Sequence, residues 1–284
     1  MKFYIVDAFA EAKYQGNQVA VFIPDGPLDT EEMQQIAQEM HFSETTFITS
    51  GKQENGGYDV RIFTPAIEVP FAGHPTIGTS HVIHTVLEGG EGDRVCLNLK
   101  VGQIPVEIKD GVYTMLQNQP EFGMFADKER VAEVLSISAG DIDENYPVQL
   151  ASTGLEAFCI PVKSTEVLSR CMVNHPAFTQ YHKDFWKCNM LAFTKVEGGL
   201  QARCFMDDPG YQEDPATGSA NGDLAGYLLK YKYFGEQDTI DYVVRQGFEM
   251  GRPSILNVHA SLKDGTYTIK VGGKAVICGE GVWR

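Results

Sequence analysis

The stretch Glu213-Asp214-Pro215-Ala216-Thr217-Gly218-Ser219-Ala220 combines a loop with the predicted first turn of a helix. Proline suits the first helical position, because its missing N–H has no intrahelical partner there and its fixed φ matches a helix. An earlier stretch, His74-Pro75-Thr76-Ile77-Gly78-Thr79-Ser80, follows the same pattern without a gap when His74 is aligned with Asp214. The pattern, X-Pro-x-x-Gly-[Ser/Thr]-[Ser/Ala], predicts an internal duplication with one helix start per half.

Each predicted helix start is also a candidate anion site. The free N–H groups of the first turn and the positive end of the helix dipole both favour a carboxylate or another anion. We expect these donors at residues 76–78 and 216–219, with His74 and Asp214 at the two mouths. Both side chains also fit a structural interpretation, since aspartate before a helix is most often a plain N-cap.

Composition and charge restrict the classes of partner and compartment. The formal charge of −15 and the pI near 4.8 argue against nucleic acid and acidic membrane surfaces, because both would be repelled. The first apolar run stops at Asp7, too soon for a signal peptide, and no later segment approaches a membrane span. We therefore expect a cytoplasmic protein.

The six cysteines are scattered along the chain, with no Cys-x-x-Cys pair and no histidine at ligand spacing. This distribution favours reduced, mostly buried thiols and predicts no metal site. Among the histidines, only His81 and His84 are three residues apart, which is weak support for metal binding.

Short, β-rich segments surround both helix motifs, and the order of segments repeats. The pattern breaks at Gln119-Pro120-Glu121, which suits a linker. We therefore predict an N-terminal domain at residues 1–118 and a C-terminal domain at residues 119–284, with the last strand, near 275–284, a candidate member of the first domain. At 284 residues the chain is long enough for two domains of ordinary size.

The second predicted helix carries Gly218, Gly222 and Gly226 at four-residue spacing. Each glycine is less favourable than alanine by about 1 kcal/mol in a helix interior, so close packing must offset the penalty. A flat glycine face lets a sheet approach the backbone. These features predict an α+β fold in which many short strands surround one central helix, twice.

A carboxylate stands near the start of another predicted strand, Ser43-Glu44-Thr45-Thr46-Phe47-Ile48-Thr49. Glutamate is depleted in strands, so its position asks for a reason. A solvated or edge-facing side chain is the more common explanation. The alternative is that Glu44 has a functional role.

With these segments in view, the chain resembles the PhzF-like phenazine-biosynthesis protein family nearly from end to end. Beside the two helix motifs and the Glu44 segment, the resemblance rests on Asp7-Ala8-Phe9, Arg61-Ile62-Phe63-Thr64-Pro65, Pro70-Phe71-Ala72-Gly73-His74-Pro75-Thr76, Gln119-Pro120 and Val271-Gly272-Gly273-Lys274-Ala275-Val276. It implies a diaminopimelate-epimerase-like fold, in which each of two similar β-barrel domains wraps around a central helix and the active site lies between them.

The resemblance also implies an isomerase that moves a proton on a small carboxylate, as phenazine-pathway members do on a dihydro-hydroxyanthranilate. Such enzymes use no metal or organic cofactor, and family members are often homodimers. By motif, Glu44 takes and returns the proton, while His74, Asp214 and Ser219 surround the substrate. The further contacts expected at the two helix starts are Gly73, Thr76, Gly78, Thr217 and Gly218.

One departure from the family pattern concerns the edge of the pocket. Where the family often has Gly-Asn-Pro before its second strand, this chain has Gly16-Asn17-Gln18. The identity of the substrate therefore stays open.

Two other functions compete with the proton-moving isomerase. An epimerase or racemase of the same fold would use two cysteines as paired base and acid. The helix starts carry His74 and Asp214, and the nearest cysteine, Cys204, lies upstream on a predicted strand, which argues against it. A protein that only binds a small acid is the third possibility.

Overall fold

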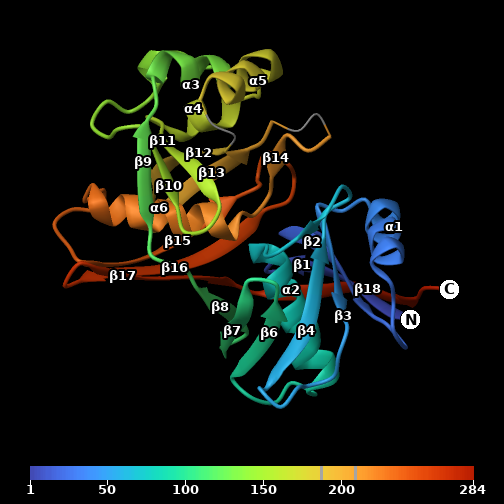
Figure 1. Ribbon diagram of the computed structural model, residues 1–284. Helices are drawn as coiled ribbons and strands as arrows, with labels where there is room; N and C mark the ends of the chain where they lie inside the picture. The colour runs from blue at the N-terminus through green and yellow to red at the C-terminus, as the bar shows by residue number, and fades with distance from the viewer. Residues whose placement is uncertain (186–187, 208–209) are drawn as a thin grey trace. The chain divides into compact units, whose positions relative to one another are not determined.

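The structure is a computed structural model that describes residues 1–185, 188–207 and 210–284. The chain divides into two compact units, one formed by Met1–Leu116 with Gly272–Arg284 and the other by Gln117–Val271. Both belong to a mixed α/β fold with a large sheet (Figure 1). Within the described ranges, no helix is long and apolar enough to cross a membrane.

The first unit contains two α-helices and a short π-helical continuation. Its elements in chain order are β1 (Lys2–Ala8), β2 (Asn17–Ile23), α1 (Thr30–Met40), β3 (Glu44–Ile48), β4 (Gly57–Phe63), β5 (Glu68–Val69), α2 (Gly73–Val82), the π-helix η1 (Ile83–Leu87), β6 (Arg94–Leu99), β7 (Gly102–Lys109), β8 (Val112–Leu116) and β18 (Ala275–Val282). The final strand, β18, pairs with β1, so the end of the chain completes the sheet of this unit.

The second unit has more helix. Its elements are β9 (Glu121–Phe125), α3 (Lys128–Val134), the 3₁₀ turn η2 (Ala139–Asp141), β10 (Gln149–Ser152), β11 (Glu156–Pro161), α4 (Thr165–Arg170), α5 (His175–Asp184), β12 (Asn189–Val196), β13 (Gly199–Phe205), β14 (Glu213–Asp214), α6 (Gly218–Lys230), β15 (Thr239–Gln246), β16 (Ser254–Lys263) and β17 (Thr266–Gly273), whose last two residues belong to the first unit.

The two units repeat one strand order. It runs β18-β1-β2-β3-β4-β6-β7 in the first and β9-β10-β11-β12-β13-β15-β16 in the second. The pairings are antiparallel, antiparallel, parallel, antiparallel, parallel and antiparallel in both. Because a parallel pair needs a crossover connection, each sheet requires two helical connections. These are α1 and α2 in the first unit, and α4–α5 and α6 in the second. The predicted duplication is confirmed at this level.

The register of the duplication differs from the one predicted. Helix α2 begins at Gly73, so Pro75 is its third residue, whereas α6 begins at Gly218 and Pro215 lies in the preceding loop. Aligning the first helical residues, Gly73 with Gly218, superimposes β5 on β14. The prediction that His74 corresponds to Asp214 is therefore wrong.

In the observed register the shared motif is Glu-x-Pro-x-x-Gly, at residues 68–73 and 213–218. Proline is tolerated throughout a first turn, where its missing N–H has no intrahelical partner, and it is equally suited to a loop. It therefore could not fix the helix start. The residue of the second unit that corresponds to His74 is Ser219.

Helices α2 and α6 are the buried helices of their units. Helix α2 packs on β1, β2 and β18, and α6 packs on β10, β11 and β16. Every residue of α6 before Lys230 is buried. A Cβ added at Gly226 would lie 2.7 Å from Cβ of Pro120, and one at Gly222 would lie 3.0 Å from Thr153 Oγ1. The predicted close approach at these glycines is confirmed.

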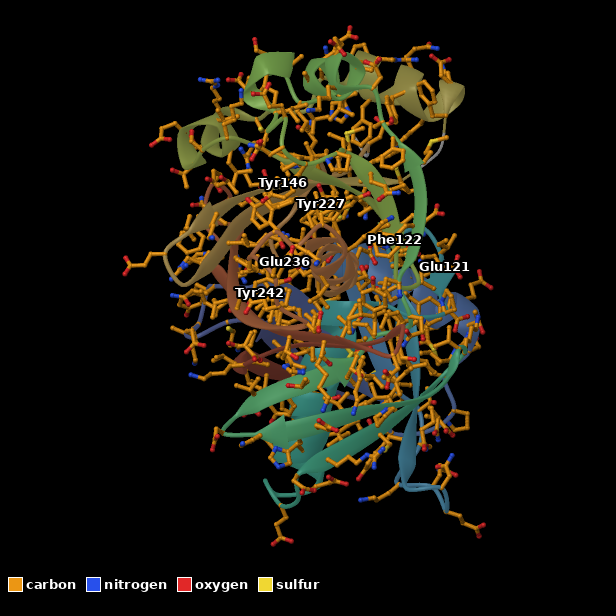
Figure 2. All side chains as sticks on the ribbon, turned by 90° about the vertical axis from the view of Figure 1, so that its left-hand side faces the viewer. Glu121, Phe122, Tyr146, Tyr227, Glu236 and Tyr242 are labelled. Carbon is orange, nitrogen blue, oxygen red and sulfur yellow. The ribbon has the colours of Figure 1, made fainter. Side chains whose placement is uncertain are left out.

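The other helices cover apolar clusters with amphipathic faces. Helix α1, capped by Asp29, buries Met33, Ile36 and Ala37 on one face. Helix α3, capped by Asp127, packs against α5 over a second cluster. The interior of the second unit also holds large aromatic side chains, including the buried Tyr227 and Tyr242 (Figure 2).

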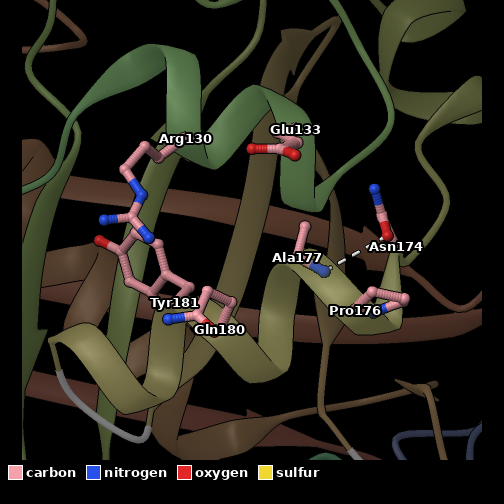
Figure 3. Close-up of a pocket in the computed structure, with 7 residues that line it drawn as sticks. All are labelled: Arg130, Glu133, Asn174, Pro176, Ala177, Gln180 and Tyr181. Carbon is pink, nitrogen blue, oxygen red and sulfur yellow. Dashed lines mark hydrogen bonds between the residues drawn. The ribbon is translucent and has the colours of Figure 1, made fainter.

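Helix α5 was not predicted, although Asn174 caps it and a proline occupies its first turn. A pocket of about 240 Å³ lies between α3 and α5 (Figure 3). Arg130 lines this pocket. Its guanidinium donates to Asp184 Oδ2 at 2.6 Å and stacks on the ring of Phe185. The charge of Arg130 is therefore already balanced, and none of the residues that line this pocket is a predicted site residue.

Candidate active site

Glu44 and His74 meet in the first unit. Glu44 is the first residue of β3, as the sequence predicts, and its side chain is 18% exposed. His74 is the second residue of α2, which packs on β3. The two side chains approach to 3.3 Å between His74 Nε2 and Glu44 Oε2. The start of a buried helix thus holds an imidazole against a partly exposed carboxylate.

The hydrogen bonds of His74 define its tautomer. The Asn17 amide nitrogen lies 3.1 Å from Nδ1, so Nδ1 accepts that hydrogen bond. Nε2 faces two acceptors, the carbonyl oxygen of Gln18 at 3.3 Å and the Glu44 carboxylate. The single proton therefore lies on Nε2, where the Gln18 carbonyl accepts it, and the Glu44 carboxylate lies 3.3 Å away.

Burial keeps this imidazole neutral. It lowers the pKa of His74 from 6.5 to about 3, and the hydrogen bond to the Gln18 carbonyl opposes this only in part. A neutral imidazole brings no positive charge to the Glu44 carboxylate beside it.

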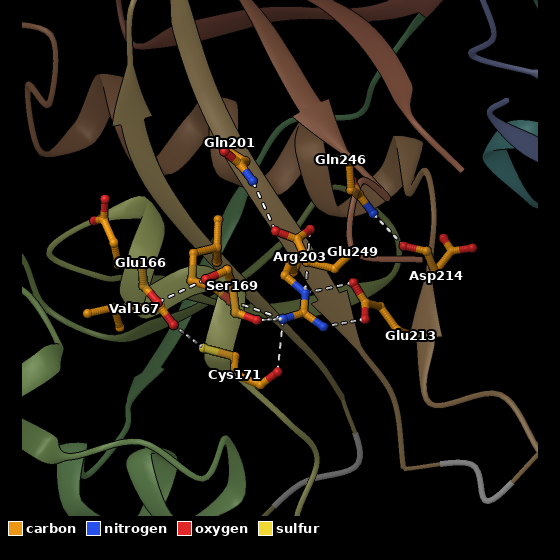
Figure 4. A network of polar contacts seen from close by, with 11 residues as sticks. Glu166, Val167, Ser169, Cys171, Gln201, Arg203, Glu213, Asp214, Gln246 and Glu249 are labelled. Atoms are coloured by element: carbon orange, nitrogen blue, oxygen red, sulfur yellow. Dashed lines mark hydrogen bonds and ion pairs between the residues drawn. The ribbon is translucent and has the colours of Figure 1, made fainter. Parts of the chain in front are cut away.

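Asp214 is held in the second unit by hydroxyl groups. Tyr211 Oη donates to its Oδ1 at 2.6 Å, and Thr217 Oγ1 donates to its Oδ2 at 2.5 Å. Gln246, at the end of β15, donates to the Asp214 carbonyl at 2.8 Å (Figure 4). It also donates to Thr217 Oγ1 at 3.0 Å. Asp214 lies on β14, four residues before α6, and is not the N-cap of that helix.

The first turn of α2 begins earlier than predicted, which changes its available donors. Thr76 N–H bonds the Ala72 carbonyl, and the Thr76 hydroxyl donates to the same oxygen at 2.8 Å. Since Pro75 has no N–H, the donors at this helix start are those of Gly73 and His74. A Cβ at Gly78 would lie 2.4 Å from Val19 Cγ1, so packing on β2 alone accounts for that glycine.

At the start of α6, the predicted residues stay close to the first turn. Gly218 and Ser219 are the first two helical residues, and Thr217 is the N-cap. The Thr217 hydroxyl is already engaged with Asp214, so its observed contact is to position that carboxylate. The structure thus brings Asp214 and Thr217 together in the second unit, as it brings Glu44 and His74 together in the first.

Sequence reasoning missed several polar residues that hold these side chains. Asn17 is the first residue of β2 and was noted only as part of a motif. Tyr211 is three residues from Asp214, whereas Gln246 carries no local signal because it reaches Asp214 from 32 residues away. Asn221, on α6, donates to Gln246 Oε1 at 2.9 Å and to the Thr217 carbonyl at the same distance. The sequence offered one indication of such polar contacts, namely amide side chains next to predicted strands, as at Asn17 and Gln246.

Cys204 is unsuited to act as a base in the resting protein. It is fully buried on β13, directly opposite Asp214 in the β13–β14 ladder. Burial, followed by the charge of Asp214, raises the pKa of its thiol, so the thiolate is disfavoured. All six cysteines are free, and four of them are buried.

His81 and His84 share one partner. Their Nδ1 atoms lie 3.0 and 2.9 Å from the hydroxyl oxygen of Tyr113. Across the residues that the structure describes, no group of three or more His, Cys, Asp or Glu side chains is arranged to hold a metal ion.

Comparison with known proteins places the chain among its relatives. A family profile described as phenazine biosynthesis-like protein, PhzC-PhzF, matches residues 6–281. An uncharacterised isomerase of Clostridium acetobutylicum is 34% identical over 96% of this chain and 95% of its own length. The trans-2,3-dihydro-3-hydroxyanthranilate isomerase of Pseudomonas aeruginosa is 31% identical over 99% of this chain and 98% of its own.

Among solved structures, the PhzF-family phenazine biosynthesis protein of Bacillus anthracis is similar with a TM-score of 0.89. It is 26% identical, and the match covers 99% of this chain and 98% of that one. The similarity in sequence and the similarity in fold both extend over nearly the whole length. The chain belongs to the PhzC-PhzF family of phenazine biosynthesis-like proteins.

Proposed function

We propose that this isomerase moves a proton between two carbons of a small, cyclic carboxylate, with Glu44 as the group that takes and returns the proton. Family membership and the isomerase names of the relatives give the reaction class. The contact between Glu44 and the neutral His74, at 3.3 Å, is the observation that carries the assignment of the base.

Glu44 has the properties that the proposed role requires. Its side chain is partly exposed, so a substrate can reach it, and one of its oxygens lies 3.3 Å from the neutral imidazole of His74. Returning the proton to the same substrate needs a group that can act as base and then as acid. No metal or organic cofactor is part of the proposed reaction.

Asp214, in this proposal, orients the substrate and does not receive the migrating proton. Held by two hydroxyls, its carboxylate is an acceptor for a hydroxyl or amino group of the substrate. The substrate carboxylate would instead be bound by first-turn N–H groups at Gly73 and Gly218, with Ser219 beside them.

We also propose the domain architecture, the cellular location and the oligomeric state that the family resemblance implies. Two barrel-like domains, one formed by residues 1–116 with 272–284 and the other by residues 117–271, would enclose α2 and α6 respectively, and the shared strand order supports this arrangement. We also propose a cytoplasmic homodimer that binds neither nucleic acid nor membranes. The free cysteines favour a reducing compartment.

Solvent-deuterium incorporation tests the reaction class before any product is known. The protein is incubated in D₂O with trans-2,3-dihydro-3-hydroxyanthranilate and with a panel of cyclic and acyclic amino-acid carboxylates, and each compound is analysed by mass spectrometry. Deuterium at a carbon of a cyclic carboxylate, without loss of any group, supports the proposal. Exchange confined to the α-carbon of amino acids, with inversion, would favour an epimerase, and no exchange in any compound would favour a binding protein.

A further inference from the structure

Arg203 is a nearly buried charge that the proposed reaction does not use. Its Nε and Nη2 donate to the two carboxylate oxygens of Glu213 at 2.9 and 2.6 Å (Figure 4). The side chains of Arg203 and Glu213 are 8% and 12% exposed. Arg203 Nη1 also donates to three carbonyl oxygens at the end of α4, those of Leu168, Ser169 and Cys171. One guanidinium therefore ties β14 to the outer helix layer of its unit.

The first unit contains the same kind of two-pronged arginine–glutamate pair, which we call the fork. Arg61 donates to both oxygens of Glu68 at 2.8 and 2.7 Å. Each arginine also lies over the ring of the phenylalanine two residues later, at 5.1 Å for Phe63 and 4.8 Å for Phe205. Each glutamate stands five residues before the first residue of its buried helix. The fork thus recurs at equivalent positions of the duplication.

The position of the fork makes it relevant to Asp214. Strand β14 consists of only Glu213 and Asp214, which pair with Phe205 and Cys204 of β13. A two-residue strand is a weak anchor by itself, and a bidentate arginine–carboxylate pair adds fixed geometry. Because Glu213 precedes Asp214 directly, the fork fixes the backbone from which the Asp214 carboxylate projects.

We propose that Arg203 and Glu213 are positioning residues for Asp214. This inference rests on the proposed function, in which Asp214 orients the substrate. Arg203 acts through Glu213, and its three carbonyl contacts make the end of α4 the fixed reference. The equivalent pair, Arg61 and Glu68, would position the loop that leads to His74 in the same way.

The test separates positioning from stability by using two variants. Arg203→Met leaves Glu213 as a poorly compensated, nearly buried charge, which destabilises the fold. Arg203→Met/Glu213→Leu removes both charges, so we expect part of the lost stability to return. Arg130→Met is the control, because it removes a more exposed arginine–carboxylate pair far along the chain from β14.

Hydrogen exchange gives a readout that does not depend on the reaction. Backbone amides of residues 212–217 should exchange at least about tenfold faster in both Arg203 variants and at the wild-type rate in Arg130→Met. Arg61→Met/Glu68→Leu should produce the same effect in residues 64–72 instead. Unchanged exchange at residues 212–217 in the Arg203 double variant would overturn the proposal, whatever the protein catalyses.

The second readout is coupling to Asp214, which a merely structural pair would not show. With trans-2,3-dihydro-3-hydroxyanthranilate as the assay compound, kcat/KM should fall by about 10- to 100-fold in Arg203→Met/Glu213→Leu, since small misplacements are costly. Adding Asp214→Asn to that variant should cost at least about tenfold less than adding it to the wild type. Full recovery of kcat/KM together with stability, or an Asp214→Asn effect of equal size in both backgrounds, would contradict positioning. If the wild type does not act on this compound, the compound of the deuterium panel that does exchange takes its place. If no compound of the panel exchanges, the proposed function fails, and the hydrogen-exchange measurement alone decides on the fork.

Discussion

Acid should destabilise the protein through its buried histidines, and His74 allows the size of the effect to be calculated. Its pKa is about 3 in the folded protein, against 6.5 for an ordinary histidine. Stability therefore falls as the pH drops below 6.5, because the unfolded chain takes up a proton that the folded chain refuses. Between pH 7 and pH 5 the loss from His74 is about 2 kcal/mol. Any folded-state pKa below about 4 gives nearly the same loss of stability. In that case His74 takes up almost no proton in the folded protein at about pH 5, so the loss depends on protonation of the unfolded chain alone.

His81 adds a second, similar contribution, because burial and its neighbour His84 lower its pKa to about 4. The wild type should thus lose about 4 kcal/mol from the two residues between pH 7 and pH 5. His74→Gln should lose about 2 kcal/mol less than the wild type over the same interval.

The measurement is urea unfolding of both proteins at pH 7, 6 and 5, with the free energy of unfolding extrapolated to water. His259→Gln, which changes an exposed histidine, controls for the loss of an imidazole side chain. If His74→Gln shows the same loss as the wild type, His74 is not held neutral, and the assignment of its single proton to Nε2 is wrong.

Three further predictions concern the packing and the polar contacts of the site. Cys204→Ala should retain deuterium exchange within about threefold of the wild type, because a buried thiol with a raised pKa is a poor base. If the variant folds but loses exchange, an epimerase that uses thiols would be favoured. Gly78→Ala should destabilise the protein by about 1–3 kcal/mol in urea unfolding, because its Cβ would meet Val19, and Val19→Ala in the same chain should restore part of the loss; no rescue would refute the packing explanation. Gln246→Ala should lower kcat/KM by about tenfold or more, because Thr217 and Asp214 lose their shared amide donor; wild-type kinetics would show that the hydroxyls suffice.

Local patterns in the sequence predicted the elements that depend on local chemistry. Glu44 stands at the start of its strand, as expected, and the two buried helices begin within three residues of the predicted starts. Features of this kind are decided by neighbours within about four residues, which a sequence displays directly.

The register of the duplication could not be read from proline and glycine alone. Proline fits a first turn and the loop before it equally well, so His74 was aligned with Asp214, five positions from the observed match. Glu68 and Glu213 occupy matching positions and indicate the correct register. Their role depends on Arg61 and Arg203, which lie on the neighbouring strands β4 and β13 and come close to them only in the folded chain. The contacts of Gln246 depend likewise on tertiary structure.

The assignment of Glu44 as the base is the central claim, and proton abstraction itself is its most direct test. Glu44→Gln keeps the size of the side chain, but it cannot take a proton from carbon. We predict that Glu44→Gln loses deuterium wash-in from D₂O into the active cyclic carboxylate, while its affinity for that compound stays within about tenfold. Asp214→Asn should still exchange, with a weaker or misoriented complex. If Glu44→Gln takes up deuterium at the wild-type rate and Asp214→Asn does not, the account is contradicted. Asp214 would then be the base, and Glu44 would orient the substrate.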